Sequence, residues 1–198
     1  LGWAPYTPVN VTTNAAANLA ILAGINAGKL IVNYTGHAAN NQWAGDSLTA
    51  GKGLLNSSDV AGLTNGSMHP IMLVMACYDG YYHFPFDDFY ADATAEVITR
   101  VAGKGAIASW SPSGLGVASG HDFLNRGFLD ALLTDENTSI GEATIAGKLE
   151  LFSMGSNLDL LDTFLLFGDP ATQVNRVAPL SVSGTVTDPD GAPFEGVL

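Results

Sequence analysis

The sequence is poor in positive charge and has little charge of either sign. Its 198 residues include 7 Lys and Arg against 19 Asp and Glu, which gives a formal net charge of −12 at pH 7. Charged residues make up only 13% of the chain, whereas about a quarter is typical of globular domains. Binding to nucleic acid phosphates needs clustered Lys and Arg. The composition therefore argues against nucleic acid as a partner.

Cysteine and long apolar runs are also scarce. Cys77 is the single cysteine, which excludes an internal disulfide and a cysteine-based zinc cluster. No apolar run approaches the roughly 18 residues that are needed to span a bilayer. The length allows one sizeable core with a small appendage. The sequence begins at Leu1 without an initiator Met or a signal peptide, so we expect a processed or trimmed part of a longer protein.

Helical and strand patterns alternate over residues 1–178, which predicts an α/β domain with a mostly parallel sheet. The expected helices cover about 14–27, 57–63, 90–102, 118–133 and 139–154, and the expected strands cover about 30–34, 71–77 and 106–110. A last apolar segment runs from 159 to 167. Residues 35–56 show no periodicity and are expected to form a long loop.

The pattern changes after Pro179. Residues 181–187 alternate as a strand does, and Asp188-Pro-Asp-Gly191 has the composition of a turn. We therefore expect residues 1–178 to form the α/β domain and residues 179–198 to begin a separate all-β module that is truncated at Leu198.

Two expected strands end beside chemically useful residues. The apolar run from Ile71 leads into Cys77, and the run from Leu30 ends in Thr35-Gly36 followed by His37. Because ligands bind at the carboxyl ends of parallel strands, neighbouring strands would place this sulfur and this imidazole side by side. A cysteine nucleophile needs such a base. The backbone N–H groups of Ala38 and Cys77 are the candidate oxyanion donors. The alternative is that Cys77 is a small core residue and His37 an ordinary loop histidine.

Aromatic residues gather near the same strand ends. Residues 78–89 contain six of them, and we take Trp43, Tyr78 and Trp110 as the candidate substrate-binding residues. The alternative for the loop is simple packing over the sheet edge. His83 lies near Asp87 and Asp88, but spacing within one loop is weak support for a metal, so no metal ligand is assigned.

The chain resembles the gingipain-type cysteine peptidases of the caspase-like clan over roughly residues 29 to 172. The motifs that carry the resemblance are Asn33-Tyr-Thr-Gly-His37 with Trp43, Met75-Ala-Cys77, Gly105-Ala-Ile-Ala108 and Phe164-Leu-Leu-Phe-Gly-Asp-Pro170. Carried over by position, His37 and Cys77 match the catalytic dyad. Ala38 stands where the family usually has the glycine that supplies an oxyanion N–H.

The resemblance implies a caspase-like three-layer α/β/α sandwich and a protein that is secreted or at the cell surface. It implies no required cofactor, although calcium is often bound and is a candidate ligand here. It also implies further strands before the histidine strand, which we expect on a missing N-terminal segment or companion chain. The tail from residue 179 resembles the start of a carboxypeptidase-regulatory-like β-sandwich module.

These observations predict a secreted cysteine endopeptidase that hydrolyses protein or peptide substrates through an acyl-enzyme. The alternative is a catalytically inactive surface or assembly protein that uses a peptidase-like scaffold. The reasons for that alternative are the missing N-terminal strands, Ala38, the low charge and the all-β tail.

Overall fold

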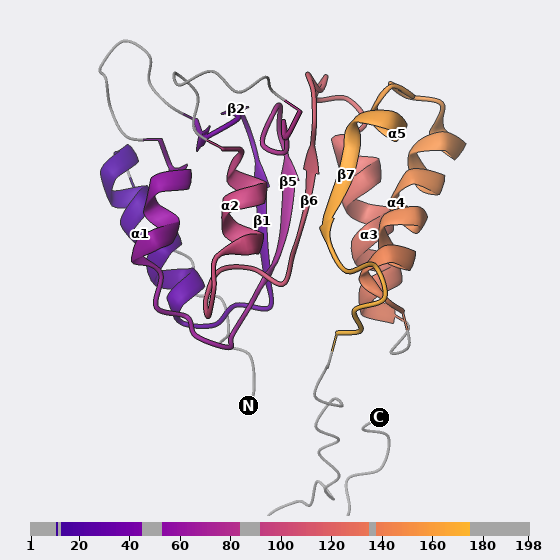
Figure 1. Cartoon of the computed structure of the whole chain (residues 1–198). Helices are drawn as coiled ribbons and strands as arrows, with labels where there is room; N and C mark the ends of the chain where they lie inside the picture. The colour runs from indigo at the N-terminus through magenta and orange to yellow at the C-terminus, as the bar shows by residue number, and fades with distance from the viewer. Residues whose placement is uncertain (1–10, 12, 45–52, 84–91, 135–137, 175–198) are drawn as a thin grey trace, which may run out of the picture.

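The computed structural model describes residues 11, 13–44, 53–83, 92–134 and 138–174, and its centre is a four-stranded sheet (Figure 1). The strands are β1 (Ile31–Thr35), β5 (Ile71–Met75), β6 (Ala108–Pro112) and β7 (Phe164–Gly168), in the order β1-β5-β6-β7. The first three strands are parallel, and β7 is antiparallel to β6.

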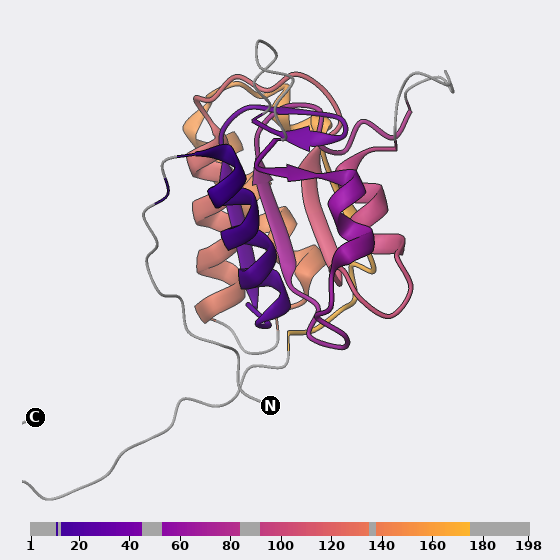
Figure 2. The ribbon, with the colours of Figure 1, turned by 90° about the vertical axis from the view of Figure 1, so that its left-hand side faces the viewer.

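Helices cover both faces of this sheet, as the two views show (Figures 1 and 2). One face carries α1 (Asn14–Asn26), α2 (Thr94–Arg100) and the 3-10 helix η1 (Ser57–Gly62); the other carries α3 (His121–Thr134) and α4 (Ile140–Met154), with α5 (Leu160–Thr163) next to β7. The expected α/β/α sandwich with a mostly parallel sheet is therefore confirmed.

Local signals explain where the longer helices begin. The Thr13 side chain accepts a hydrogen bond from the backbone N–H of Ala16 and so caps α1. Ser139 and Glu142 form a reciprocal capping box at the start of α4. That helix ends at Gly155, whose left-handed backbone (φ 65°) suits glycine.

Strand β5 divides the core in two because its side chains alternate between the faces of the sheet. All five of its residues are buried. Ile71, Leu73 and Met75 pack in the cluster with α3 and α4, whereas Met72 and Val74 pack in the cluster with α1 and α2. A strand buried on both faces is what the continuous apolar run predicted.

Three sequence expectations differ from the structure. Residues 38–56 contain β2 (Ala38–Ala39), β3 (Gln42–Trp43) and β4 (Leu55–Asn56), a small antiparallel sheet whose strands are too short for a visible alternation. Helix α2 begins at Thr94, later than expected. The segment 159–167 divides into α5 and β7 because helical hydrogen bonding ends at Phe164, where the backbone becomes extended.

The predicted boundary at residue 178 and the β-module of residues 179–198 lie outside the described residues. None of the helices in the described part of the chain is long and apolar enough to cross a membrane.

Candidate active site

His37 and Cys77 follow paired positions of two neighbouring parallel strands. Thr35 of β1 is the register partner of Met75 of β5. The N–H of Gly36 donates to the carbonyl oxygen of Met75 over 3.2 Å, which extends the contact one residue beyond β1. Each candidate catalytic residue therefore stands two residues past the same rung of the sheet, where neighbouring strands are about 4.8 Å apart.

Both residues are accessible at this edge. The His37 side chain is exposed, and Cys77 is a free, half-buried cysteine. The Cys77 thiol donates to the carbonyl oxygen of Gly116 (3.3 Å), and the sulfur accepts from the Gly116 N–H (3.4 Å). The sulfur thus lies against the main chain of the loop that follows β6 and is not enclosed by aliphatic side chains.

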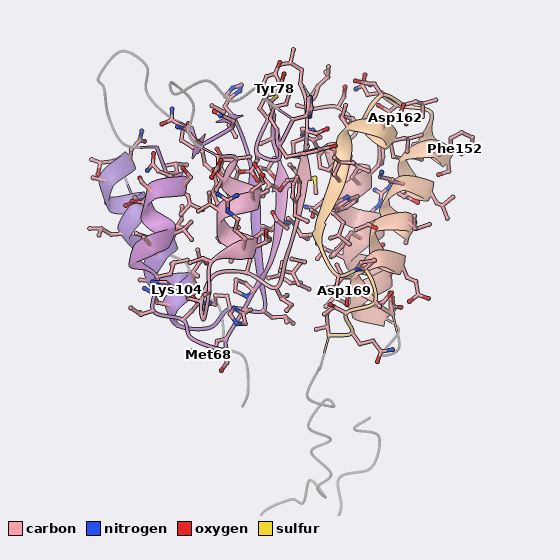
Figure 3. The ribbon with its side chains drawn as sticks, in the orientation of Figure 1. Met68, Tyr78, Lys104, Phe152, Asp162 and Asp169 are labelled. Carbon is pink, nitrogen blue, oxygen red and sulfur yellow. The ribbon has the colours of Figure 1, made fainter. Side chains whose placement is uncertain are left out.

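The turn after Cys77 is fixed by backbone hydrogen bonds to the end of β6 and the loop that follows it. Tyr78 has a left-handed backbone (φ 55°), which is uncommon for a bulky residue and occurs at functional sites. Its N–H donates to Gly114 O, and the N–H of Gly80 donates to Pro112 O, each over 2.9 Å. Figure 3 shows Tyr78 at the edge of the sheet opposite to Met68 and Lys104. The side chain of Tyr78 is half-buried and packs against Tyr81.

The β2–β3 hairpin sets the direction of the Ala38 N–H. The N–H of Ala44 donates to the carbonyl oxygen of His37 over 2.7 Å, and Ala38 is the register partner of Trp43. In an antiparallel ladder, hydrogen-bonded and non-hydrogen-bonded pairs alternate, so the Ala38–Trp43 pair is of the second kind. Its N–H groups therefore point away from the hairpin ladder, which leaves the Ala38 donor directed outward.

Two of the three predicted substrate-binding residues are buried, which corrects that expectation. Trp43 is 1% exposed and stacks on Tyr34 with ring centroids 4.3 Å apart. Trp110 is 0% exposed and packs in the core against Phe128 and Phe164. A large aromatic side chain contributes most to stability when its surface is removed from water. Both indoles pack against internal aromatic rings and do not face a substrate.

A buried carboxylate that was not predicted from the sequence lies two residues after Cys77. Asp79 is 1% exposed and accepts hydrogen bonds from Trp43 Nε1 (2.7 Å) and Ser111 Oγ (2.8 Å). Desolvation by burial raises the pKa of Asp79 to about 6, and these two hydrogen bonds partly oppose the rise. Burial, and then the nearby charge of Asp79, also raise the pKa of Tyr34. The only sign of this residue in the sequence is its place as an acid two residues after Cys77, just past the apolar run.

A second histidine lies behind the loop that contacts Cys77. His121 is 5% exposed, and its ring packs edge-on against Phe164. Its Nε2 has no hydrogen-bond partner among the described residues. Burial lowers the pKa of His121, and the charge of Asp122 partly opposes this. Its burial could not be predicted from the sequence, which does not show what covers a residue at the start of a helix.

The described residues do not assemble a metal site. No group of three or more His, Cys, Asp and Glu side chains gathers among them. His83 packs against the rings of Tyr81 and Tyr82. Asp87 and Asp88, its suggested partners, lie outside the described residues, so calcium binding stays an expectation.

A groove of about 730 Å³ lies between α4 and β7. Its mostly apolar lining includes Ile145, Leu149 and Leu166 and is bordered by Trp110. Neither His37 nor Cys77 contributes to it. The two candidate catalytic residues therefore lie at the strand-end edge of the sheet, outside this groove.

The chain is similar in sequence to curated peptidases. Gingipain R2 and Gingipain R1 of Porphyromonas gingivalis are each 26% identical to the chain over 175 residues, which covers 83% of this chain but only 22% and 16% of the respective relatives. The chain thus spans less than a quarter of their length.

Solved structures show the same fold. The complex of the pro- and mature domains of Porphyromonas gingivalis RgpB superposes with a TM-score of 0.68 at 23% identity, covering 79% of this chain and 37% of that one. The Arg-specific cysteine proteinase gingipain R superposes with a TM-score of 0.64 at 24% identity, covering 79% and 36%. The fold is therefore the caspase-like fold of these enzymes. A family model, Peptidase family C25, matches residues 4–175, and the chain belongs to this family of gingipain-type cysteine peptidases.

Proposed function

We propose that this protein is a secreted or surface cysteine endopeptidase in which His37 and Cys77 form the catalytic dyad. The observation that carries the proposal is the shared register: both residues follow the paired positions Thr35 and Met75 by two residues. Membership of family C25 supports the reaction class. The substrates are proteins or peptides.

In the proposed mechanism His37 takes the proton of the Cys77 thiol. The thiolate then attacks the carbonyl carbon of a peptide bond and forms a tetrahedral oxyanion. Collapse of this intermediate breaks the C–N bond, and His37 gives its proton to the leaving amine. The acyl group stays on Cys77 as a thioester. His37 next takes a proton from water, whose oxygen attacks the thioester and releases the carboxylic acid and the thiol.

The oxyanion is stabilised by backbone donors in this proposal. The Ala38 N–H points away from the hairpin ladder, as the alternation of the β2–β3 pairs requires. The N–H of Cys77 is the second donor. Preorganised donors of this kind lower the barrier because they need no reorganisation as charge develops. Tyr78, half-buried next to Cys77, is the remaining candidate for substrate contact. The reaction requires no cofactor, and calcium would have a structural role.

The test compares the wild-type protein with Cys77→Ala, His37→Ala and the control His69→Ala. His69 lies before β5, at the opposite end of that strand from Cys77. We expect wild type and His69→Ala to cleave a peptide library and to be alkylated by iodoacetamide at Cys77. Cys77→Ala should abolish cleavage, and His37→Ala should lower it by roughly 10²-fold or more. A folded wild-type protein with an unreactive Cys77 and no cleavage would favour the inactive scaffold.

A further inference from the structure

A buried carboxylate connects the nucleophile turn to the small sheet that follows His37. Asp79 lies two residues after Cys77, and its Oδ1 accepts a hydrogen bond from Trp43 Nε1 of β3 over 2.7 Å. Its Oδ2 accepts from Ser111 Oγ of β6 over 2.8 Å. A buried carboxylate is costly unless it is paired or hydrogen-bonded, so these donors fix its position firmly.

Contacts continue from Trp43 to the main chain of His37. The Trp43 ring stacks on Tyr34 with centroids 4.3 Å apart and planes 6° from parallel. The Tyr34 hydroxyl donates to the carbonyl oxygen of His37 over 2.7 Å. The N–H of Ala44, the residue after Trp43, donates to the same oxygen over 2.7 Å. An unbroken series of contacts therefore runs from Asp79 to the peptide group of His37.

The turn that carries Asp79 is fixed from other directions too. Its carbonyl oxygen accepts from the N–H of Ala95 in α2 over 3.1 Å, and the N–H of Gly80 donates to Pro112 O over 2.9 Å. The carboxylate thus projects from a rigid support. A displacement of Trp43 would therefore move the β2–β3 hairpin relative to Cys77, because the turn of Asp79 is held in place by α2 and β6.

We propose that Asp79 is a positioning residue, which sets the placement of His37 relative to Cys77 through Trp43 and Tyr34. The inference rests on the proposed peptidase function. Asp79 takes no part in bond making, since both of its carboxylate oxygens are occupied by Trp43 and Ser111. Its effect is on the geometry of the dyad, where a displacement of about 1 Å can cost on the order of 10²-fold in rate.

The variants distinguish the loss of the Asp79–Trp43 hydrogen bond from the loss of either side chain. Asp79→Ala removes both acceptors, whereas Asp79→Asn keeps one acceptor oxygen for Trp43. The amide group of that variant can donate to Ser111 Oγ, whose hydroxyl can turn toward Ser109 Oγ at 2.8 Å. Trp43→Phe keeps an aromatic ring on Tyr34 but deletes the donor. Asp162→Asn, an exposed acid-to-amide change in α5, is the matched control.

The experiment measures kcat and KM on a peptide substrate, together with the unfolding temperature of each variant. We expect Asp79→Ala and Trp43→Phe each to lower kcat by about 10- to 100-fold with KM within about twofold. The double variant should lose little more than the stronger single variant, because both changes break one connection. Asp79→Asn should recover most of kcat, and Asp162→Asn should match wild type.

Different results would contradict the positioning role of Asp79 and the proposed peptidase function. Wild-type kcat in folded Trp43→Phe, or losses that multiply in the double variant, would overturn the positioning role while leaving the peptidase intact. If Asp79→Ala does not fold, Trp43→Phe still decides the matter. A wild-type protein that cleaves no peptide would overturn the proposed function and this inference with it.

Discussion

The main chain of Gly116 contacts the sulfur of Cys77 with both of its polar groups. The thiol donates to the Gly116 carbonyl oxygen at 3.3 Å, and the Gly116 N–H donates to the sulfur at 3.4 Å. On its other side Gly116 is in close contact with the core. A Cβ at this position would lie 2.8 Å from His121 Nε2 and 3.0 Å from the carbonyl oxygen of Ala76. The absence of a side chain at Gly116 therefore lets the loop approach Cys77.

Gly116→Ala should change the environment of the Cys77 sulfur although the added methyl group is not on the side that contacts it. The added methyl group has no room beside His121, so the loop must move away from Cys77 or the imidazole must shift. We expect kcat/KM for peptide cleavage to fall by on the order of tenfold, because the sulfur loses its fixed partner. The rate of Cys77 alkylation by iodoacetamide should change in the same variant.

A second substitution tests the cause. In Gly116→Ala/His121→Ala the shorter contact is relieved, so part of the lost activity should return, while His121→Ala alone serves as the control. Failure of the double variant to recover any activity, at a stability equal to that of the single variant, would assign the loss to a different contact.

The buried carboxylate makes stability depend on pH in a defined direction. The pKa of Asp79 is raised from 3.8 to about 6 in the folded protein, so the native state holds this proton more tightly than the unfolded chain does. The stabilisation from the protonated form is complete below about pH 4 and is lost as pH rises through 6. The free energy of unfolding of wild type should therefore fall relative to Asp79→Asn by about 2 kcal/mol between pH 4 and pH 7.

Urea unfolding of both proteins at several pH values measures this difference. The comparison cancels the titration of every other group that the two proteins share. A difference that is constant from pH 4 to pH 7 would contradict a carboxylate held in this desolvated position.

Trp110→Phe tests whether Trp110 belongs to the core or to the substrate site. The indole is fully buried against Phe128 and Phe164, and its Nε1 has no hydrogen-bond partner among the described residues. The variant loses packing but no hydrogen bond. We expect a loss of about 1–2 kcal/mol in the free energy of unfolding, with KM for peptides unchanged. A severalfold rise in KM at equal stability would restore the substrate-binding role.

Sequence identified the architecture because burial leaves a periodic signal. A continuous apolar run, as in β5, is typical of a strand buried on both faces, and Thr13 and Ser139 are residue types that commonly precede a helix, as they do at α1 and α4. Strand β1 was the exception. Within the described sheet it is an edge strand, and its Asn33 is exposed and donates to Asn125 of α3.

The candidate site was only half visible in the sequence. His37 and Cys77 could be chosen because each lies two residues past the end of a strand, and parallel strands bring such ends to one edge. The three short strands from Ala38 to Asn56 carried no signal, because two residues cannot show an alternation. Trp43 was therefore taken for a substrate-facing residue when its indole is buried against Tyr34.

By itself, the sequence determined the α/β layering and the two residues proposed for chemistry, because periodicity and strand ends are local properties of a chain. Only the tertiary structure decided which side chains support them. Asp79 meets Trp43 across 36 positions, and Cys77 meets Gly116 across 39. Contacts of that range depend on how the strand-end loops fold over the sheet, and no local pattern of residues encodes them.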